Sequence, residues 1–144
     1  MSSLLWHTLK VSCLAALLSL SAAARADTLF EDIGGEPKLK AAVAELVNVI
    51  LADERINFTF AGADLERFKT SLYNQLCELA GGPCIYDGRS MRDVHQKLPI
   101  TNTQFNALAE DLYIAFDRVG VSYRAQNRMV ALLAPMQKDI VRKK

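Results

Sequence analysis

Apolar residues recur at intervals of three and four along the chain after residue 28, and this spacing constrains the fold more than any other feature. It places apolar side chains on one face of an α-helix, whereas a half-buried strand would alternate apolar and polar residues. Four such stripes are present, over 39–51, 65–79, 105–119 and 129–140. No sustained strand alternation, repeat or low-complexity tract occurs. The sequence therefore predicts an all-α fold with four substantial helices.

Turn and capping residues set the expected helix ends. Gly34-Gly35 ends a short segment over 29–33, and Asp64 is placed to cap the helix that follows. Gly81-Gly82-Pro83 stops that helix, and the loop after it runs to Ser90. A short helical piece over 91–97 is then limited by Pro99. Pro135 is expected to kink the last helix.

The first 26 residues have the pattern of a secretory signal. Lys10 precedes an apolar run over 11–20, shorter than the ~20 residues a membrane-spanning helix needs, and Ala24-Arg25-Ala26 is a small-residue cleavage site. We therefore expect an exported, periplasmic protein with one domain over 27–144 and no stable membrane insertion once the leader is cleaved. The alternative is an uncleaved leader that anchors the chain.

The charge balance restricts the partners. Cleavage would remove Lys10 and Arg25, lowering Lys and Arg from 17 to 15 against 16 Asp and Glu, so the net charge would change from +1 to −1. There is no basic face with interleaved aromatic residues, which argues against a nucleic-acid partner. The remaining 118 of 144 residues suffice for one domain with a sizeable core.

Two cysteines, Cys77 and Cys84, lie outside the leader. An oxidising compartment permits a disulfide between them. The alternative is that Cys77 is simply buried in its helix, since sequence alone does not give the distance between the two residues.

His95 is the only histidine outside the leader. Its surroundings, residues 81–91 followed by Val94-His95, together with Gly34-Gly35 and Phe60, resemble the group I truncated haemoglobins. The likeness runs over about 29–141. It implies a truncated globin-like two-over-two helical sandwich around a noncovalent haem b. The absence of a C-x-x-C-H motif fits noncovalent binding.

The resemblance assigns roles to individual residues. His95 matches the proximal ligand of the iron, Phe60 matches the aromatic residue on the haem face, and Met91 and Val94 match proximal contacts. Three residues, Arg67, Lys69 and Tyr86, fall where relatives approach the haem propionates. The remaining expected haem contacts are Val47, Phe68, Leu72 and Phe105.

The distal side departs from the family pattern. Val47 stands where many members have Tyr, Phe68 and Leu72 stand where Gln is frequent, and Ser71 lies where some have a second iron-binding His. Bound O2 is therefore expected to lack a strong side-chain donor and to leave quickly. A one-residue shift of register would instead turn Tyr73 into the pocket.

The expected function is binding of the diatomic gases O2, CO and NO at a haem iron, in oxygen transport or NO-related chemistry, with a reductase or other electron donor as a further partner. A gas-binding protein is favoured over a dedicated enzyme. Three alternatives remain: an NO dioxygenase or weak peroxidase, an electron-transfer or haem-handling protein, and a helical interaction module without haem.

Overall fold

The computed structural model describes residues 27–142. The helices are α1 (Leu29–Ile33), α2 (Gly35–Ala52), η1 (Asn57–Phe60), α3 (Leu65–Leu79), α4 (Met91–Val94), α5 (Asn102–Arg118), α6 (Tyr123–Leu133), η2 (Ala134–Met136) and α7 (Gln137–Ile140). The all-α prediction is confirmed. The expected leader, 1–26, lies outside the described residues.

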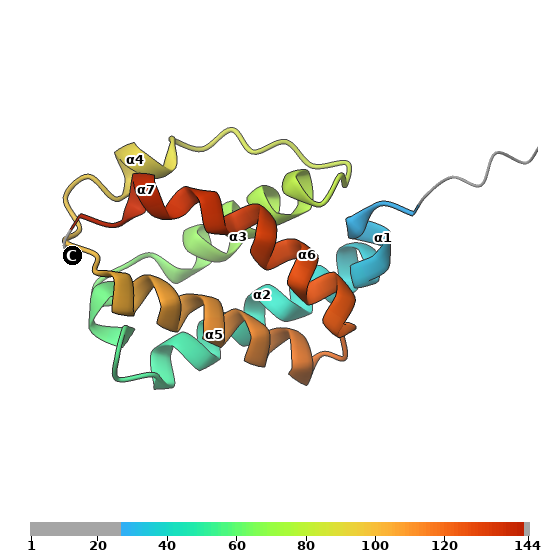
Figure 1. The fold of residues 1–144 in the computed structure, drawn as a ribbon, viewed down its shortest axis with the longest axis horizontal. Helices are drawn as coiled ribbons and strands as arrows, with labels where there is room; N and C mark the ends of the chain where they lie inside the picture. Colours follow the sequence, from blue (N-terminus) through green and yellow to red (C-terminus); the bar gives the residue numbers. More distant parts are fainter. Residues whose placement is uncertain (1–26, 143–144) are drawn as a thin grey trace, which may run out of the picture.

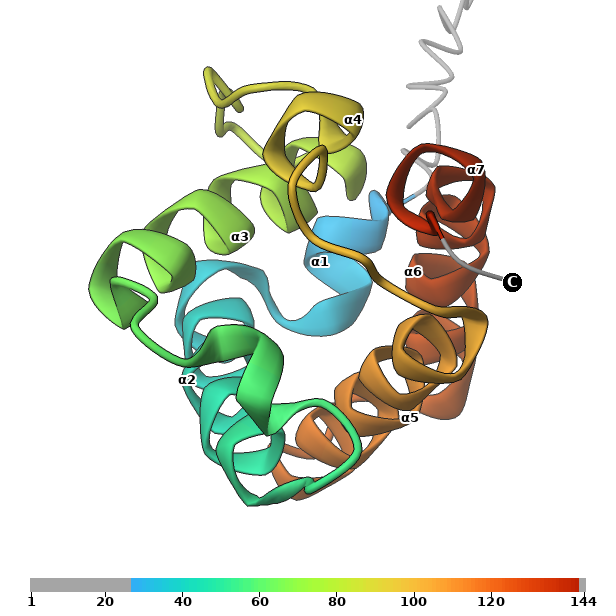
Figure 2. The same cartoon turned by 90° about the vertical axis from the view of Figure 1, so that its left-hand side faces the viewer.

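Four long helices form two crossed pairs. The helix α2 packs against both α5 and α3, and α6 packs against α5 and α3. Figure 1 shows α2 and α5 running below α3 and α6, and Figure 2 shows the four helices from the end, with α4 at the edge near α3 and α7. This is the predicted two-over-two sandwich.

The core is built on α2, whose stripe is buried from Leu39 through Val43 and Leu46 to Ile50. Phe116 of α5 and Met129 of α6 meet it and are fully buried. Leu51, the last residue of the predicted stripe, is 46% exposed and lies one residue before the end of the helix.

A tight turn joins α1 to α2. Gly34 has φ +109° and Gly35 has φ +71°, in the left-handed region that side chains with a Cβ rarely adopt. The chain can therefore reverse within these two residues, and α1 reaches the far end of α3, where the Phe30 amide donates to the Ala80 carbonyl.

The end of α3 fixes the loop that follows. Asp64 caps the start of α3 by accepting from the Arg67 amide, and α3 ends at Leu79 as predicted. A disulfide joins Cys77 to Cys84 with Cα atoms 5.7 Å apart, so the bonded alternative holds. The disulfide therefore holds the start of the loop over 81–90 against α3, and the loop then leads into α4. No helix within residues 27–142 is long and apolar enough to cross a bilayer.

Candidate functional site

A cavity of about 540 Å³ lies among α3, α4, α5 and the C-terminal helices. This size is typical of a cofactor pocket. Its wall is mostly apolar. Leucines from four elements (Leu46, Leu72, Leu108 and Leu133) contribute to it, as do Phe60, Phe68 and Phe105. The apolar stripes of the sequence thus enclose a cavity as well as a core.

His95 enters this cavity from the end of α4. Its ring nitrogen Nδ1 lies 2.8 Å from the Met91 carbonyl oxygen, which also accepts from the His95 backbone amide at 3.1 Å. A carbonyl oxygen only accepts, so Nδ1 carries the proton of the neutral ring. Nε2 is then the nitrogen with a free lone pair, as metal binding requires.

An aromatic pair forms part of the wall. The rings of Phe60, on η1, and Phe68, on α3, meet edge to face with centroids 5.1 Å apart. Leu72 lies one turn after Phe68 and lines the same cavity. These flat and branched side chains suit a planar apolar ligand.

Polar residues reach the cavity from the loop before α4 and from the start of α3. Arg67, Tyr86 and Arg89 line it, and the Tyr86 hydroxyl donates to the Arg89 carbonyl oxygen at 2.9 Å. Burial raises the pKa of the Tyr86 phenol, so the hydroxyl keeps its proton. A Cβ at Gly88 would come within 2.4 Å of the Tyr86 ring, so a side chain at this position would displace that ring.

The structure brings nine of the eleven predicted site residues to this one cavity. They are Phe60, Arg67, Phe68, Leu72, Tyr86, Met91, Val94, His95 and Phe105. They come from five separate stretches of sequence, so their convergence is a property of the fold.

Val47 and Lys69 do not line the cavity. On α2 the residue that lines the cavity is Leu46, one position before Val47. Successive helical residues point about 100° apart, so Val47 faces another direction and is buried in the core with 6% exposed. Lys69 is likewise turned away from Phe68, lines a groove between α2 and α3, and pairs with Glu66 at 2.5 Å.

Tyr73 also faces that groove rather than the cavity. Its hydroxyl lies 3.5 Å from Cys84 Sγ, and its ring lies 5.3 Å from Lys40 Nζ. The alternative register that would turn Tyr73 into the pocket is wrong, and Leu72 is the inward residue. Ser71 lines the cavity.

Sequence reasoning missed several residues of the wall. Arg89 lay in a loop where no periodicity shows which side chains point inward. Gln75 was passed over on α3, although it lies three residues after Leu72 and so on the same face. Met136 and Ile140 belonged to a recognised stripe, but a stripe does not distinguish a packed core from a cavity wall.

These features suit one class of ligand. A cavity with apolar walls, a single imidazole with one free nitrogen and two arginines would accept a planar macrocycle that carries a metal and acidic groups. Within residues 27–142, no group of three or more His, Cys, Asp or Glu side chains could hold a bare metal ion. The residues present therefore fit haem.

Comparison with known proteins gives the family. The family model described as bacterial-like globin matches residues 28–142. The chain belongs to the bacterial-like globin family. The resemblance to truncated haemoglobins that the sequence indicated is confirmed.

Individual relatives agree. The group 1 truncated hemoglobin of Tetrahymena pyriformis is 31% identical over 116 residues, which cover 81% of this chain and 96% of the relative. The Fe(III) crystal structure of the T. pyriformis protein superposes with a TM-score of 0.77 at 30% identity, covering 80% of this chain and 98% of that one. The 2/2 hemoglobin of Synechococcus sp. PCC 7002, described with covalently attached heme, gives a TM-score of 0.75 at 29% identity, with 80% and 98% covered.

Membership of the globin family implies gas binding by means of haem. In this globin the nine converging residues are the candidates for holding the cofactor.

Proposed function

We propose that this globin would bind haem b through His95 Nε2 and take up the diatomic gases O2, CO and NO at the haem iron. Haem supplies an iron atom that coordinates such gases reversibly. The chain would supply the imidazole that binds the iron, the apolar enclosure, and the arginines that meet the propionates, while the Tyr86 hydroxyl would hold the loop that carries Arg89.

The arrangement of His95 carries this proposal. Its Nδ1–H···O contact of 2.8 Å to Met91 fixes the tautomer and the orientation of the ring. When one ring nitrogen of an imidazole donates a hydrogen bond in this way, the other nitrogen becomes a more basic metal ligand and the ring is held in place. A histidine that served only packing would not need to line an apolar cavity with its ring held by such a bond.

The cavity wall is mostly apolar and carries few side-chain amides or hydroxyls. Thr59 donates its hydroxyl proton to the Ile56 carbonyl at 2.7 Å. Gln104 accepts from the Thr101 amide at 2.9 Å through its amide oxygen, and Gln75 donates to the Met136 sulfur at 3.7 Å, so the N–H groups of these two amides are at most weakly bonded. Leu46, Phe60 and Leu72 give this wall apolar side chains. We infer that bound O2, which is polarised and gains most from a donor, leaves quickly, whereas CO and NO depend less on one.

A spectroscopic experiment tests the proposal. Purified protein reconstituted with haem b should show a Soret band that shifts when CO is added to the reduced form. Protein that takes up no stoichiometric haem would refute it.

A substitution tests the role of the distal wall. Leu72→Gln should introduce an amide donor and slow O2 release about 10- to 100-fold, since such a hydrogen bond is worth ~1–3 kcal/mol. Leu72→Met, which keeps the size without a donor, is the control and should leave the rate nearly unchanged. Equal rates in the two variants would show that residue 72 does not face the bound gas.

We also propose that the protein works outside the cytoplasm, in the periplasm. The leader pattern over 1–26 supports export, and the Cys77–Cys84 disulfide supports an oxidising compartment. N-terminal sequencing of protein recovered from the periplasmic fraction should begin at Asp27. Recovery of the chain with its first 26 residues in the membrane fraction would favour the anchored alternative.

The physiological role is proposed as oxygen binding and transport or reaction with NO. Either role needs the iron in its reduced state, so a reductase or other electron donor is a proposed partner. The apolar wall counts against a peroxidase, because cleavage of a peroxide bond benefits from a polar distal group.

A further inference from the structure

The helix that carries the candidate iron ligand is too short to hold itself in place. α4 has four residues, Met91–Val94, and His95 is its C-cap. The first turn of a helix costs more conformational entropy than its hydrogen bonds return, so an isolated helix of this length does not form in water. The Ser90 side chain caps it by accepting from the Asp93 amide at 3.2 Å, but this is a local bond. Contacts from elsewhere in the chain must fix its position.

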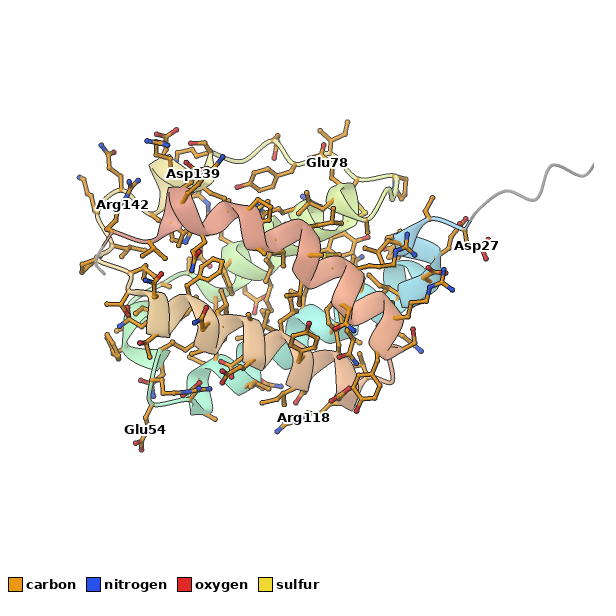
Figure 3. The ribbon with its side chains drawn as sticks, viewed as in Figure 1. Asp27, Glu54, Glu78, Arg118, Asp139 and Arg142 are labelled. Atoms are coloured by element: carbon orange, nitrogen blue, oxygen red, sulfur yellow. A yellow bond between two sulfur atoms is a disulfide. The ribbon has the colours of Figure 1, made fainter. Side chains whose placement is uncertain are left out.

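Those contacts come from the C-terminus. Arg92 of α4 pairs with Asp139 of α7, with 2.7 Å between Nη2 and Oδ1. The Arg142 guanidinium donates to the Arg92 carbonyl oxygen at 3.3 Å. The Arg142 backbone amide donates to the Ile100 carbonyl oxygen at 2.9 Å. Figures 1 and 2 both show α7 beside α4, and Figure 3 labels Asp139 and Arg142 near this end of the molecule.

The same C-terminal segment also forms part of the cavity. Met136 and Ile140 line the cavity, while Asp139, between them in sequence, turns to Arg92. Gln137 adds a bond of 3.1 Å to Asn102 at the start of α5. One short segment therefore touches the cavity with its apolar side chains and holds the His95 segment with its polar ones.

The chain is also held on both sides of α4. The Cys77–Cys84 disulfide fixes the loop before α4 to α3. The bond from the Arg142 amide to the Ile100 carbonyl fixes the connection after α4. The ion pair with Asp139 acts between these two points, at Arg92, three residues before His95 in sequence.

We propose that Arg92, Asp139 and Arg142 form a C-terminal clamp that positions His95 against the iron, and that they are positioning residues for gas binding. This inference rests on the proposed function. In the clamp the ion pair sets where α4 lies. Its loss should weaken the bond between His95 and the iron and widen the range of positions that the His95 ring occupies, without removing the ligand itself.

The experiment compares Arg92→Gln with Arg118→Gln. Arg118 pairs with Glu45 at 2.5 Å, away from α4, and the exposed fractions of the two side chains, 56% and 26%, are close to the 64% and 29% of Arg92 and Asp139. The control therefore removes an equivalent ion pair that should not act on His95. A third variant, Arg92→Asp with Asp139→Arg, reverses the pair and should restore it.

Three readouts apply to each variant. The first is the rate of haem loss to an excess of an acceptor globin. The second is the iron–histidine stretching band of the reduced protein in resonance Raman spectra. The third is amide hydrogen exchange at 91–95 in the haem-free protein.

The clamp predicts that Arg92→Gln loses haem about two- to fivefold faster than Arg118→Gln, the range that an exposed ion pair is worth. It also predicts a shifted or broadened iron–histidine band and faster exchange at 91–95, with both effects reversed in the swapped variant. Identical behaviour of Arg92→Gln and Arg118→Gln in all three readouts would overturn the clamp.

Failure of the proposed function and failure of the clamp give different results. If the unmodified protein takes up no haem, the proposed function fails, and amide exchange at 91–95 still decides whether the C-terminus holds α4. If the unmodified protein binds haem but Arg92→Gln behaves like its control, the clamp alone fails.

Discussion

Replacing Asp111 by Asn should make the protein more stable above pH 6 while changing little below pH 4. Asp111 lies on α5 with 1% of its surface exposed, and its Oδ2 atom has no hydrogen-bond partner. Burial raises the pKa of its carboxyl to about 6, with the neighbouring Asp53 carboxylate adding to the effect. Arg55 offsets part of this at 3.9 Å from Oδ1. Asn has the same shape and cannot ionise.

The sign and size follow from the two pKa values. The carboxyl has an ordinary pKa of 3.8 when unfolded and about 6 when folded, so between these values the folded state holds more protons. The free energy of unfolding therefore falls as pH rises from about 4 to about 6, and it stays low above that. A shift of this size corresponds to roughly 2–3 kcal/mol at most.

Urea unfolding at a series of pH values measures this. The difference in free energy of unfolding between Asp111→Asn and the unmodified protein should grow by roughly 2–3 kcal/mol from pH 4 to pH 8. Taking the difference at each pH cancels the contributions of haem and of carboxyls that do not contact Asp111. Asp53 still contributes to the difference, because Asp111 is, after Arg55, one of the groups that lower its pKa. Parallel pH profiles for the two proteins would refute the reasoning.

Two further outcomes follow from the loop before α4. Replacing Cys77 and Cys84 together by Ser should lower the free energy of unfolding by roughly 2–3 kcal/mol, because the bond closes a short loop, and adding a reductant to the unmodified protein should match this in urea unfolding. Gly88→Ala should displace Tyr86 and speed haem loss in a transfer assay, because the new methyl would meet the ring at 2.4 Å. Unchanged haem loss would show that Tyr86 does not hold the cofactor.

The sequence predicted the parts of the fold that local chemistry determines. Asp64, Gly34-Gly35 and the glycine pair after α3 each set a helix end through capping or a positive φ, and these positions depend on few distant contacts. Periodicity likewise assigned Leu72 rather than Tyr73 to the inner face of α3. Such features are readable because their cause lies within a few residues.

Other features depend on where distant elements meet. Val47 was expected in the pocket, but the side chain of its neighbour Leu46 reaches the cavity, a difference of one helical step that alignment to relatives did not resolve. The contact of Asp139 with Arg92 spans 47 residues, and no local pattern pairs one surface charge with another at that separation. Burial of Asp111 was unexpected for the same reason, since only the packing of α5 removes it from water.

The most direct measurement is the absorption and resonance Raman spectrum of a His95→Gly variant with and without added imidazole. If His95 is the iron ligand, the variant loses the iron–histidine band and most of its haem, and imidazole restores both by entering the space left by the side chain. A variant that keeps its haem and an unchanged proximal band in the absence of imidazole would contradict the assignment.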